Sequence, residues 1–389
     1  MTMAQAPRKQ RALKVVRANE LAVVDDADIP QVGPDEVLVR VVFVATNPVD
    51  AKSADFSPTP GATVGSDFAG DVVAVGAAVE KQLRVGDRVC GLAFGNNPLR
   101  PDNGAFAEYV AAPGDLVFNI PPGMDLDQAA TLPCGLATVG FALYRHLGLP
   151  LPDPPATESE AGAKPQYILI YGGGTATGTL LIQMALRSGL VPVTTCSPKR
   201  FERVKALGAA EAFDYRSPTV GADIRAYTND ALDMAVDCIT TTASMAVCYG
   251  AIGRGGGKYV SLDPFPLRTH TRRSVRPSWV LALTMFGTPI AWKRPFTTEA
   301  KPAERAFAEK WFSIAQEMLD RGEIQPHSHE PGRPVNQRWL TNLPGQYAWS
   351  ADHSTLETTS IHCCVKLIVL IRAFVSVSVL MDAIMIDWY

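Results

Sequence analysis

The sequence predicts an α/β protein of two domains, a β-rich first domain and a second domain built on a doubly wound parallel sheet. Three observations support this prediction. The chain has 389 residues, 47% of them hydrophobic, which is enough for two globular cores. Short β-branched runs punctuated by glycine occupy about the first 145 residues. From Tyr167 onward strands alternate with helices, a pattern typical of parallel sheets.

In the β-rich region, three glycine-bounded runs predict strands, at Glu36–Asn47, Gly70–Gly76 and Gly86–Gly95. The segment Asp125–Gly148 then turns helical, with Asp125 or Asp127 as the N-cap. A proline- and glutamate-rich stretch without periodicity follows at 149–166 and predicts an exposed linker.

The second region opens with the strand YILIY (Tyr167–Tyr171) and a helix over about 177–188. The later elements follow the same alternation: strand 191–196, helix 199–208, and strands at 212–215, 232–239 and 257–262. Strands separated by helices in this order predict a doubly wound parallel sheet.

Composition narrows the possible partners. The formal net charge of −3 gives no electrostatic reason to expect nucleic acid or an acidic membrane. The seven cysteines have no CxxC spacing, so we expect no disulfide framework and a reducing, cytoplasmic location. The first residues carry charges but no apolar segment of the kind a signal peptide needs, so no secretory signal is expected.

The glycines of YGGGTATG predict a nucleotide-binding loop. Gly172, Gly173 and Gly174 lack the Cβ atoms that would keep a pyrophosphate from the backbone N–H groups, and the next helix supplies a favourable dipole. The match to GxGxxG is imperfect, because Thr177 stands where the third glycine is expected and Gly178 follows one residue late. An ordinary strand–helix turn is the alternative, but the position between a buried strand and a helix favours a nucleotide.

The end of the next strand predicts which nucleotide binds. An NAD site places an acid about twenty residues past the loop, whereas the segment CSPKRF offers Ser197, Lys199 and Arg200. Two cations and a hydroxyl suit the 2′-phosphate of NADPH. A merely solvated helix start is disfavoured, because cations oppose the dipole at a helix N-terminus.

Together, the β-rich domain, GDRV and the strand–glycine–helix unit resemble the medium-chain dehydrogenase/reductase superfamily, over roughly residues 13–334. Zinc alcohol dehydrogenases of that superfamily have a cysteine where this chain has Asn47, and a His-Glu pair where it has Ser66 and Asp67. Only Cys134 stands at a ligand position. A catalytic zinc needs three protein ligands, so the chain resembles a zinc-free reductase with no metal.

Within the zinc-free branch, six segments in order resemble the fungal trans-acting enoyl reductases, which serve polyketide synthases whose own enoyl reductase domain is inactive. These segments are NPVDAK, LPCGLATVG, YGGGTATG, TCSPKRF, FDYRSP and PSWVLALTMFG. The resemblance implies a monomer that uses NADPH to reduce an α,β-unsaturated thioester on the acyl carrier protein of a polyketide synthase or PKS-NRPS. It also implies a GroES-like catalytic domain (1–148), a linker (149–166), a Rossmann NADPH-binding domain (167–290) and a segment returning to the catalytic domain (291–334). Residues 335–389, beyond the resemblance, are expected to be an atypical tail.

The same resemblance assigns site residues. Those near the cofactor are Val49, Asp50, Ala51 and Lys52 beside the reacting centre, Gly174, Thr175, Ala176 and Thr177 at the pyrophosphate, Ser197, Pro198, Lys199, Arg200 and Tyr215 at the 2′-phosphate, and Ser261 and Leu262 at the nicotinamide half. Those in the acyl pocket are Thr138, Val139, Gly140, Phe141, Ala142, Leu143, Tyr144 and Arg145, then Leu283, Thr284, Met285, Phe286 and Gly287. Each acyl-pocket residue could instead be plain helix core, Lys52 could be a solvated lysine, and Tyr215 could simply pack on the sheet.

Lys52 and Thr138 are the expected catalytic residues, because they match family positions beside the nicotinamide and carry N–H or O–H donors. Such donors stabilise the negative charge that develops on the thioester oxygen. The proton donor to the α-carbon stays open between water and a side chain. Two alternative functions also stay open: a free-standing quinone or enone oxidoreductase, and a non-catalytic NADPH-binding relative.

After about Pro334 the resemblance ends. The run Cys363–Leu380 is apolar but contains Lys366 and Arg372, so a membrane anchor is not expected. An aberrant gene end is the preferred interpretation of this tail.

Overall fold

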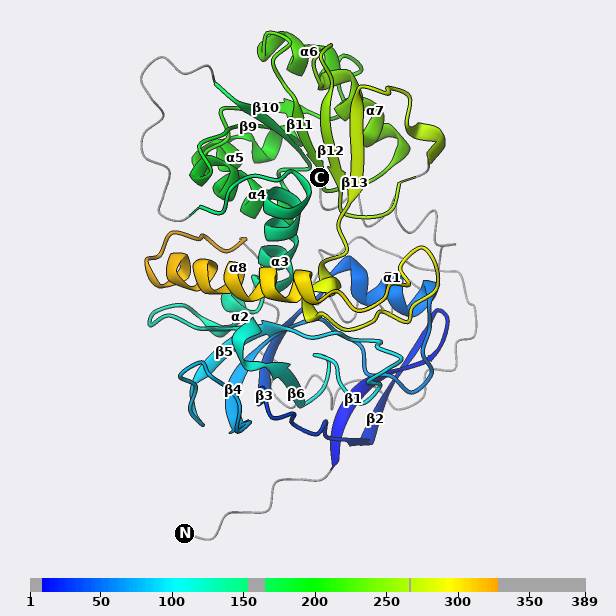
Figure 1. Ribbon diagram of the computed structural model, residues 1–389, viewed down its shortest axis with the longest axis vertical. Coiled ribbons are helices and arrows are strands. Elements are labelled where there is room, and N and C mark those ends of the chain that lie inside the picture. The colour runs from blue at the N-terminus through cyan, green and yellow to red at the C-terminus, as the bar shows by residue number, and fades with distance from the viewer. Residues whose placement is uncertain (1–8, 153–164, 266, 328–389) are drawn as a thin grey trace, which may run out of the picture. The chain divides into compact units, whose positions relative to one another are not determined.

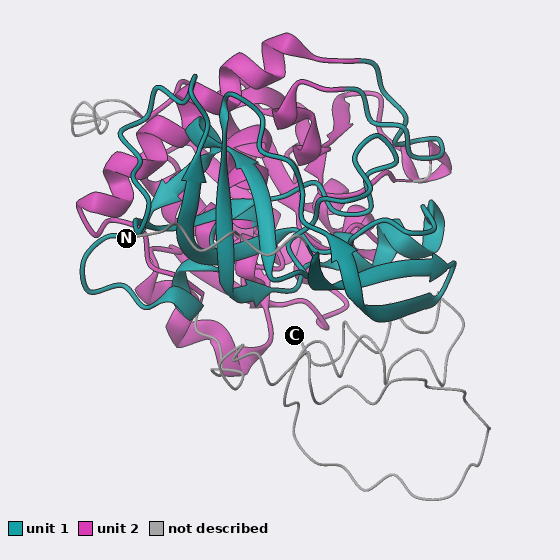
Figure 2. Cartoon of the chain, turned by 90° about the horizontal axis from the view of Figure 1, so that it is seen from below, with its two compact units in different colours: residues 1–134, 289–299, 328–380 teal, residues 135–288, 300–327, 381–389 magenta. Residues whose placement is uncertain are grey.

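The computed structural model describes residues 9–152, 165–265 and 267–327 (Figure 1). These residues form two compact units, coloured separately in Figure 2. The described part of the first unit is 9–134 with Pro289–Glu299, and that of the second is 135–288, with its two gaps, and 300–327. The predicted tail at 335–389 and most of the predicted linker lie outside the described residues.

The first unit is built on a five-stranded antiparallel sheet, in the order β6-β3-β4-β5-β7, and a separate β1-β2 hairpin. Its elements are β1 Lys9–Arg17, β2 Glu20–Asp28, β3 Glu36–Ala45, α1 Pro48–Phe56, β4 Asp67–Val75, β5 Arg88–Leu92, β6 Tyr109–Pro113, β7 Val117–Asn119 and α2 Leu126–Ala129. Val39, Phe68, Val89 and Phe106 are fully buried in its core. The three predicted strands are present, but β4 begins at Asp67 rather than at Gly70.

The second unit contains a six-stranded parallel sheet in the order β10-β9-β8-β11-β12-β13. Its elements are α3 Pro133–Gly140, which begins at the unit boundary, β8 Tyr167–Tyr171, α4 Ala176–Arg187, β9 Val191–Cys196, α5 Phe201–Ala206, β10 Glu211–Asp214, α6 Val220–Tyr227, β11 Met234–Asp237, α7 Thr242–Ala251, β12 Gly257–Ser261, β13 Val275–Trp279 and α8 Pro302–Asp320. The doubly wound prediction is confirmed. Because β8, β9, β11 and β12 are parallel, their carboxyl ends share one edge of the sheet, where such folds bind nucleotides.

The units divide the chain differently from the predicted domains. The boundary falls between Cys134 and Gly135, inside α3, rather than at residue 148. The reason is packing within the second unit: Trp311 Nε1 of α8 donates to the Leu136 carbonyl at 2.8 Å, and a Cβ on Gly140 would lie 2.3 Å from that nitrogen.

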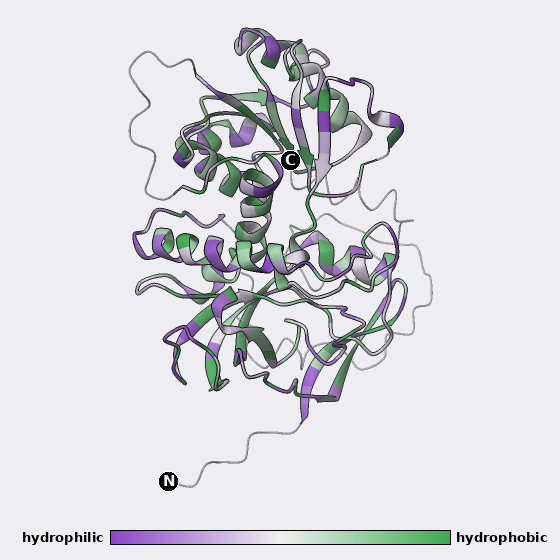
Figure 3. Cartoon of the chain, in the orientation of Figure 1, coloured by the Kyte–Doolittle hydropathy of each residue, from purple (hydrophilic) through white to green (hydrophobic). Residues whose placement is uncertain are grey.

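The predicted return segment 291–334 is also divided. Pro289–Glu299 belongs to the first unit, where Trp292 Nε1 donates to the Asn96 carbonyl at 2.7 Å. Helix α8 belongs to the second unit, with Trp311 and Phe312 buried. Figure 3 shows polar and apolar residues alternating along α8, as expected of a helix with one buried face.

The predicted helical stretch 125–148 is not one helix. Asp125 is the N-cap residue of α2, which ends at Ala129, and α3 starts afresh at Pro133. A π-helical turn follows at Phe141–His146, with the Leu147 N–H donating to the Ala142 carbonyl at 3.0 Å. Proline lacks a backbone donor, so it starts a helix more readily than it continues one. Among the described helices, none has the length and apolarity to cross a bilayer.

Candidate cofactor and active site

The glycine loop between β8 and α4 leaves a row of N–H groups for an anion. Gly172, at φ +90°, and Gly173 donate to the Thr195 carbonyl at 3.1 and 3.0 Å, so their N–H groups are already used. Within the described part of the chain, no hydrogen bond engages the N–H groups of Gly174, Ala176 and Thr177. These donors lie at the N-terminus of a twelve-residue helix, which suits a pyrophosphate.

Gly178, in the first turn of α4, is a residue that the sequence analysis did not assign to the site. A Cβ at this position would lie 2.2 Å from the Gly172 carbonyl oxygen, so only glycine allows α4 to approach the loop this closely. Thr175 reinforces the turn, because its Oγ1 donates to the Gly172 carbonyl at 2.8 Å and accepts from the Gly178 N–H at 3.0 Å. The late third glycine of the imperfect motif was therefore the signal for this residue.

The residues predicted at the 2′-phosphate follow β9. Ser197 is 5% exposed, and its Oγ has no hydrogen-bond partner among the described residues. Pro198, Lys199 and Arg200 form a short 3-10 turn, in which Lys199 is exposed. Arg200 lies beside the glycine loop, since its Cγ would be 3.6 Å from a Cβ on Gly174. An unpartnered hydroxyl next to two cations fits a phosphate group, so these residues are compatible with NADPH.

Beyond β10, the predicted residue Tyr215 lies under a cation. The Arg216 guanidinium is 5.5 Å from the centre of the Tyr215 ring and also pairs with Asp214, at 3.0 Å. This pairing holds the pKa of the Asp214 carboxyl below its usual range, with the Arg216 hydrogen bond as the largest cause.

Ser261 and Leu262, predicted near the nicotinamide half, lie at the carboxyl end of β12. The Ser261 hydroxyl donates to the Asp263 carbonyl at 2.7 Å, and the Leu262 N–H donates to Thr240 Oγ1 at 3.2 Å. The hydroxyl of Ser261 is thus used within the protein, and its carbonyl accepts from the Val280 N–H at 2.9 Å.

Asp237, at the end of β11, organises this region and was missed by the sequence analysis, which assigned it to a strand. Its fully buried carboxyl accepts from the Ile239 and Thr240 N–H groups, from Ser244 Oγ at 2.6 Å and from the Tyr259 hydroxyl at 2.8 Å. Burial raises the pKa of this carboxyl, and the donors partly oppose that effect. Asp237 therefore fixes the loop that holds Leu262.

The first segment predicted to line the acyl pocket is mostly packed into the protein. Val139, Gly140, Phe141, Ala142, Leu143 and Tyr144 are all buried. Thr138 is half-buried, whereas Arg145 is exposed and pairs with Glu304 through two bonds of 2.9 and 3.0 Å. The core interpretation is thus favoured for the buried members, and Thr138 stays a predicted site residue.

The second acyl-pocket segment forms a 3-10 turn at Ala282–Phe286, closed by Gly287 at φ +71°. Leu283, Thr284 and Met285 are buried, while Phe286 and Gly287 are half-buried. The Thr284 hydroxyl donates to the Leu281 carbonyl at 2.8 Å. The last two residues are therefore the most accessible members of this segment.

In the first unit, α1 carries Val49, Asp50, Ala51 and Lys52. The Asp50 carboxyl does not face solvent: its Oδ2 accepts from the Asn47 N–H at 2.7 Å and its Oδ1 from the Ser66 hydroxyl at 2.6 Å. Any contact of Asp50 with a cofactor would therefore come from its backbone. Val49, Ala51 and Lys52 are half-buried.

The positions that hold zinc in alcohol dehydrogenases here hydrogen-bond to one another. Asn47 Nδ2 donates to Asp67 Oδ2 at 2.9 Å, and the Cys134 N–H donates to Asp67 Oδ1 at 2.8 Å. In the described part of the chain, no group of three or more His, Cys, Asp or Glu side chains could hold a metal ion.

We predict that this protein keeps its activity after treatment with a chelator, because an amide and a serine replace two ligand types of the metal site. Metal analysis of the purified protein should find far less zinc than one ion per chain. A stoichiometric zinc whose removal abolishes turnover would contradict this interpretation of Asn47 and Ser66.

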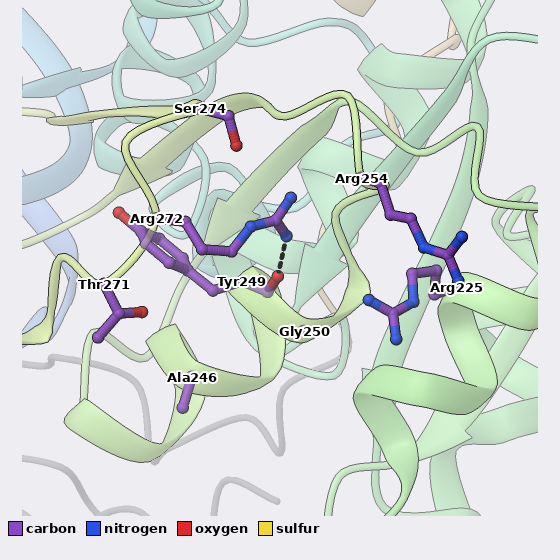
Figure 4. Close-up of a pocket in the computed structure, with 8 residues that line it drawn as sticks. All are labelled: Arg225, Ala246, Tyr249, Gly250, Arg254, Thr271, Arg272 and Ser274. Atoms are coloured by element: carbon purple, nitrogen blue, oxygen red, sulfur yellow. Dashed lines mark hydrogen bonds between the residues drawn. The ribbon is translucent and has the colours of Figure 1, made fainter.

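A basic hollow of about 470 Å³ lies elsewhere in the second unit (Figure 4). Its lining includes Arg225 on α6, Arg254 before β12, and Arg272. Arg272 caps the end of α7, because it donates to the carbonyls of Tyr249, Ile252 and Gly253. The hollow contains none of the predicted site residues, so we assign Arg272 a structural role.

Comparison with known proteins finds two families and a solved structure that resemble this chain. Residues 33–122 match the family described as the alcohol dehydrogenase GroES-like domain, and residues 176–288 match the zinc-binding dehydrogenase family. A putative zinc-dependent alcohol dehydrogenase from Rhizobium etli is a structural neighbour, with a TM-score of 0.67 and 25% identity, over 85% of this chain and 92% of that chain.

Two relatives have far higher identity. The trans-enoyl reductase opdC of Penicillium oxalicum is 53% identical over 329 residues, which cover 84% of this chain and 90% of opdC. The trans-enoyl reductase iccB of Talaromyces variabilis is 49% identical over 337 residues, which cover 84% of this chain and 89% of iccB.

Proposed function

Because this chain belongs to the medium-chain dehydrogenase/reductase superfamily, with the fungal trans-enoyl reductases as close relatives, we propose that it is a trans-acting enoyl reductase. In this role it uses NADPH to reduce the α,β-unsaturated thioester of a polyketide chain held on a carrier protein. The observation that carries the proposal is the identity of about half of all aligned residues to trans-enoyl reductases over most of the chain.

The proposal that the cofactor is NADPH depends on the residues that follow β9. A protein of this family binds a nicotinamide cofactor, and the adenosine side decides between NADPH and NADH. Ser197 Oγ, buried and without a partner among the described residues, needs a hydrogen-bonding group, and a 2′-phosphate oxygen provides one. Lys199 and Arg200 add the positive charge, and the Asp214 carboxylate is already paired with Arg216.

The chemistry proposed for this chain is stabilisation of an enolate. The bound cofactor supplies a hydride to the β-carbon of the enoyl thioester. The Lys52 ammonium, on α1, and the Thr138 hydroxyl, on α3, are the groups proposed to donate to the thioester oxygen as negative charge develops there. Water or a side chain then protonates the α-carbon.

The partner proposed is the acyl carrier protein of a polyketide synthase or PKS-NRPS, and the reductase itself is proposed to be a cytoplasmic monomer. β13 is an edge strand of the described sheet. Pro277 removes a backbone donor from β13, and the exposed Arg276 precedes it. Proline and charge at a sheet edge disfavour pairing with a second copy.

The test is a choice of substrates for the purified protein. We expect NADPH oxidation with an enoyl thioester carried on a recombinant acyl carrier domain, and little oxidation with a simple quinone. A carrier domain loaded with the saturated thioester is the control, because it presents the same protein surface without the reducible bond. NADPH oxidation with a quinone, and with no enoyl thioester, would instead make the protein a quinone oxidoreductase.

A further inference from the structure

The first unit buries two carboxyl groups to which the proposed chemistry gives no part. Asp50 is 4% exposed and Asp67 is 1% exposed. Neither forms an ion pair with any residue that the structure describes. A buried carboxyl without a cation destabilises a fold unless hydrogen bonds satisfy its oxygens, so the bonds that these two make are informative.

Those bonds tie together three segments that are far apart in the sequence. Asp67 joins the beginning of β4 to Asn47, 20 residues away, and to the Cys134 N–H, 67 residues away. Asp50 joins the first turn of α1 to Ser66, 16 residues away, and to the Asn47 N–H that precedes the helix. Asn47 belongs to both sets of bonds, so the carboxyls act as one network.

The network fixes the rotation of α1 about its axis. Successive residues of an α-helix are about 100° apart around the axis, so Lys52 lies roughly 200° from Asp50. Anchoring the Asp50 side chain against Ser66 therefore turns Lys52 to the opposite face of the helix. A loosened anchor would let this short, nine-residue helix rotate or shift.

We propose that Asp67 and Asp50 are positioning residues for Lys52: through Asn47, Ser66 and the Cys134 N–H they hold α1 in place with hydrogen bonds, where a zinc enzyme of this superfamily holds the same segments with a metal. This inference rests on the proposed function, because it gives the network its purpose in placing the Lys52 ammonium.

The charge state of the network agrees with this geometry. Burial raises the pKa of Asp50 to about 7, and hydrogen bonds from Ser66 and Asn47 oppose the shift. Burial also raises the pKa of Asp67 well above its usual range, and the Asp50 charge adds to the effect. The other titratable groups near the network are the thiols of Cys90, on β5, and Cys134. Burial is the main cause that raises the pKa of Cys90, and the charge of Lys81 opposes this shift.

The raised pKa of Asp50 determines how the free energy of unfolding changes with pH. The folded-state pKa of Asp50 lies above the unfolded value of 3.8, so the folded state binds more protons between those two values. The free energy of unfolding should therefore fall as the pH rises through this window, and Asp50→Asn should flatten that fall.

The test compares Asp67→Ala with Asp67→Asn. We expect Asp67→Ala to lower kcat about tenfold while the Kd for NADPH changes less than about threefold, because a misplaced donor impairs the transition state more than cofactor binding. Asp67→Asn should recover most of kcat. Its carboxamide oxygen can accept from the Cys134 N–H, and its NH₂ can donate to Asn47 once that amide flips.

Asn103→Ala is the matched control. Asn103 is buried in the same unit and also makes two bonds, to the Ala111 carbonyl at 2.8 Å and from the Ala111 N–H at 3.0 Å. It should lower the thermal midpoint without a specific loss of kcat. If Asp67→Ala does not fold, Ser66→Ala removes one bond of the network and should lower kcat by a smaller factor.

A spectroscopic readout separates this inference from the proposed function. Reductive methylation with ¹³C labels the lysines for NMR, and the resonance that disappears in Lys52→Arg is that of Lys52. This resonance should shift in Asp67→Ala and stay unshifted in Asn103→Ala, whatever the substrate. Equal kcat losses in Asp67→Ala and Asn103→Ala, or an unshifted Lys52 resonance in Asp67→Ala, would overturn the positioning role. A wild type inactive on every enoyl thioester would overturn the proposed function, while the resonance would still decide on the network.

Discussion

Replacing Lys52 with alanine is expected to slow reduction of a carrier-bound enoyl thioester about 10²–10³-fold, since removal of one oxyanion donor typically has this effect. The Kd for NADPH should change far less, because the lost interaction strengthens only as charge develops on the thioester oxygen. Steady-state kinetics with the loaded carrier domain and fluorescence titration with NADPH measure the two quantities.

Two further variants serve as comparisons for Lys52→Ala. Lys9→Ala, in the same unit, removes an exposed lysine that pairs with Asp28 at 2.7 Å, and it should leave kcat nearly unchanged. Lys52→Arg keeps the charge but changes the reach and shape of the donor, so an intermediate rate is expected. If Lys52→Ala keeps kcat within a few-fold and only weakens NADPH, Lys52 binds the cofactor and does not stabilise the enolate.

Replacing Lys199 with alanine is expected to weaken NADPH about 10- to 100-fold and to leave NADH binding unchanged. The loss of a charge-assisted hydrogen bond costs about 1.5–3 kcal/mol, and each 1.4 kcal/mol corresponds to about tenfold in Kd. Only the 2′-phosphate distinguishes the two nucleotides, so the NADH titration is an internal control. Isothermal titration of each nucleotide gives the comparison.

Lys205→Ala is the matched control for this change. Lys205 lies on α5, close in sequence to Lys199, but its ammonium pairs with Glu211 at 2.6 Å. It should not alter the preference for NADPH. Ser197→Ala sharpens the test, because its hydroxyl has no partner among the described residues and its loss should affect NADPH more than stability. Equal affinity of the wild type for both nucleotides would contradict the assignment of this site.

Residue patterns that extend over a few neighbouring positions determined the two-part architecture of this chain. Strand YILIY, the glycine loop and the following helix were predicted from neighbouring residues, since alternation, glycine and helix dipoles act over a few residues. The cations after β9 were predicted in the same way, because their distance from the glycine loop is a local property of the fold.

Only the tertiary structure decided which residues work together at longer range. The Asp50–Asp67 network and the donors around Asp237 depend on contacts that sequence spacing does not specify. The boundary inside α3 has the same origin, since Gly140 packs on Trp311 from a helix far along the chain. Local patterns fix which elements form, whereas burial and hydrogen-bond satisfaction between distant segments fix what each side chain can do.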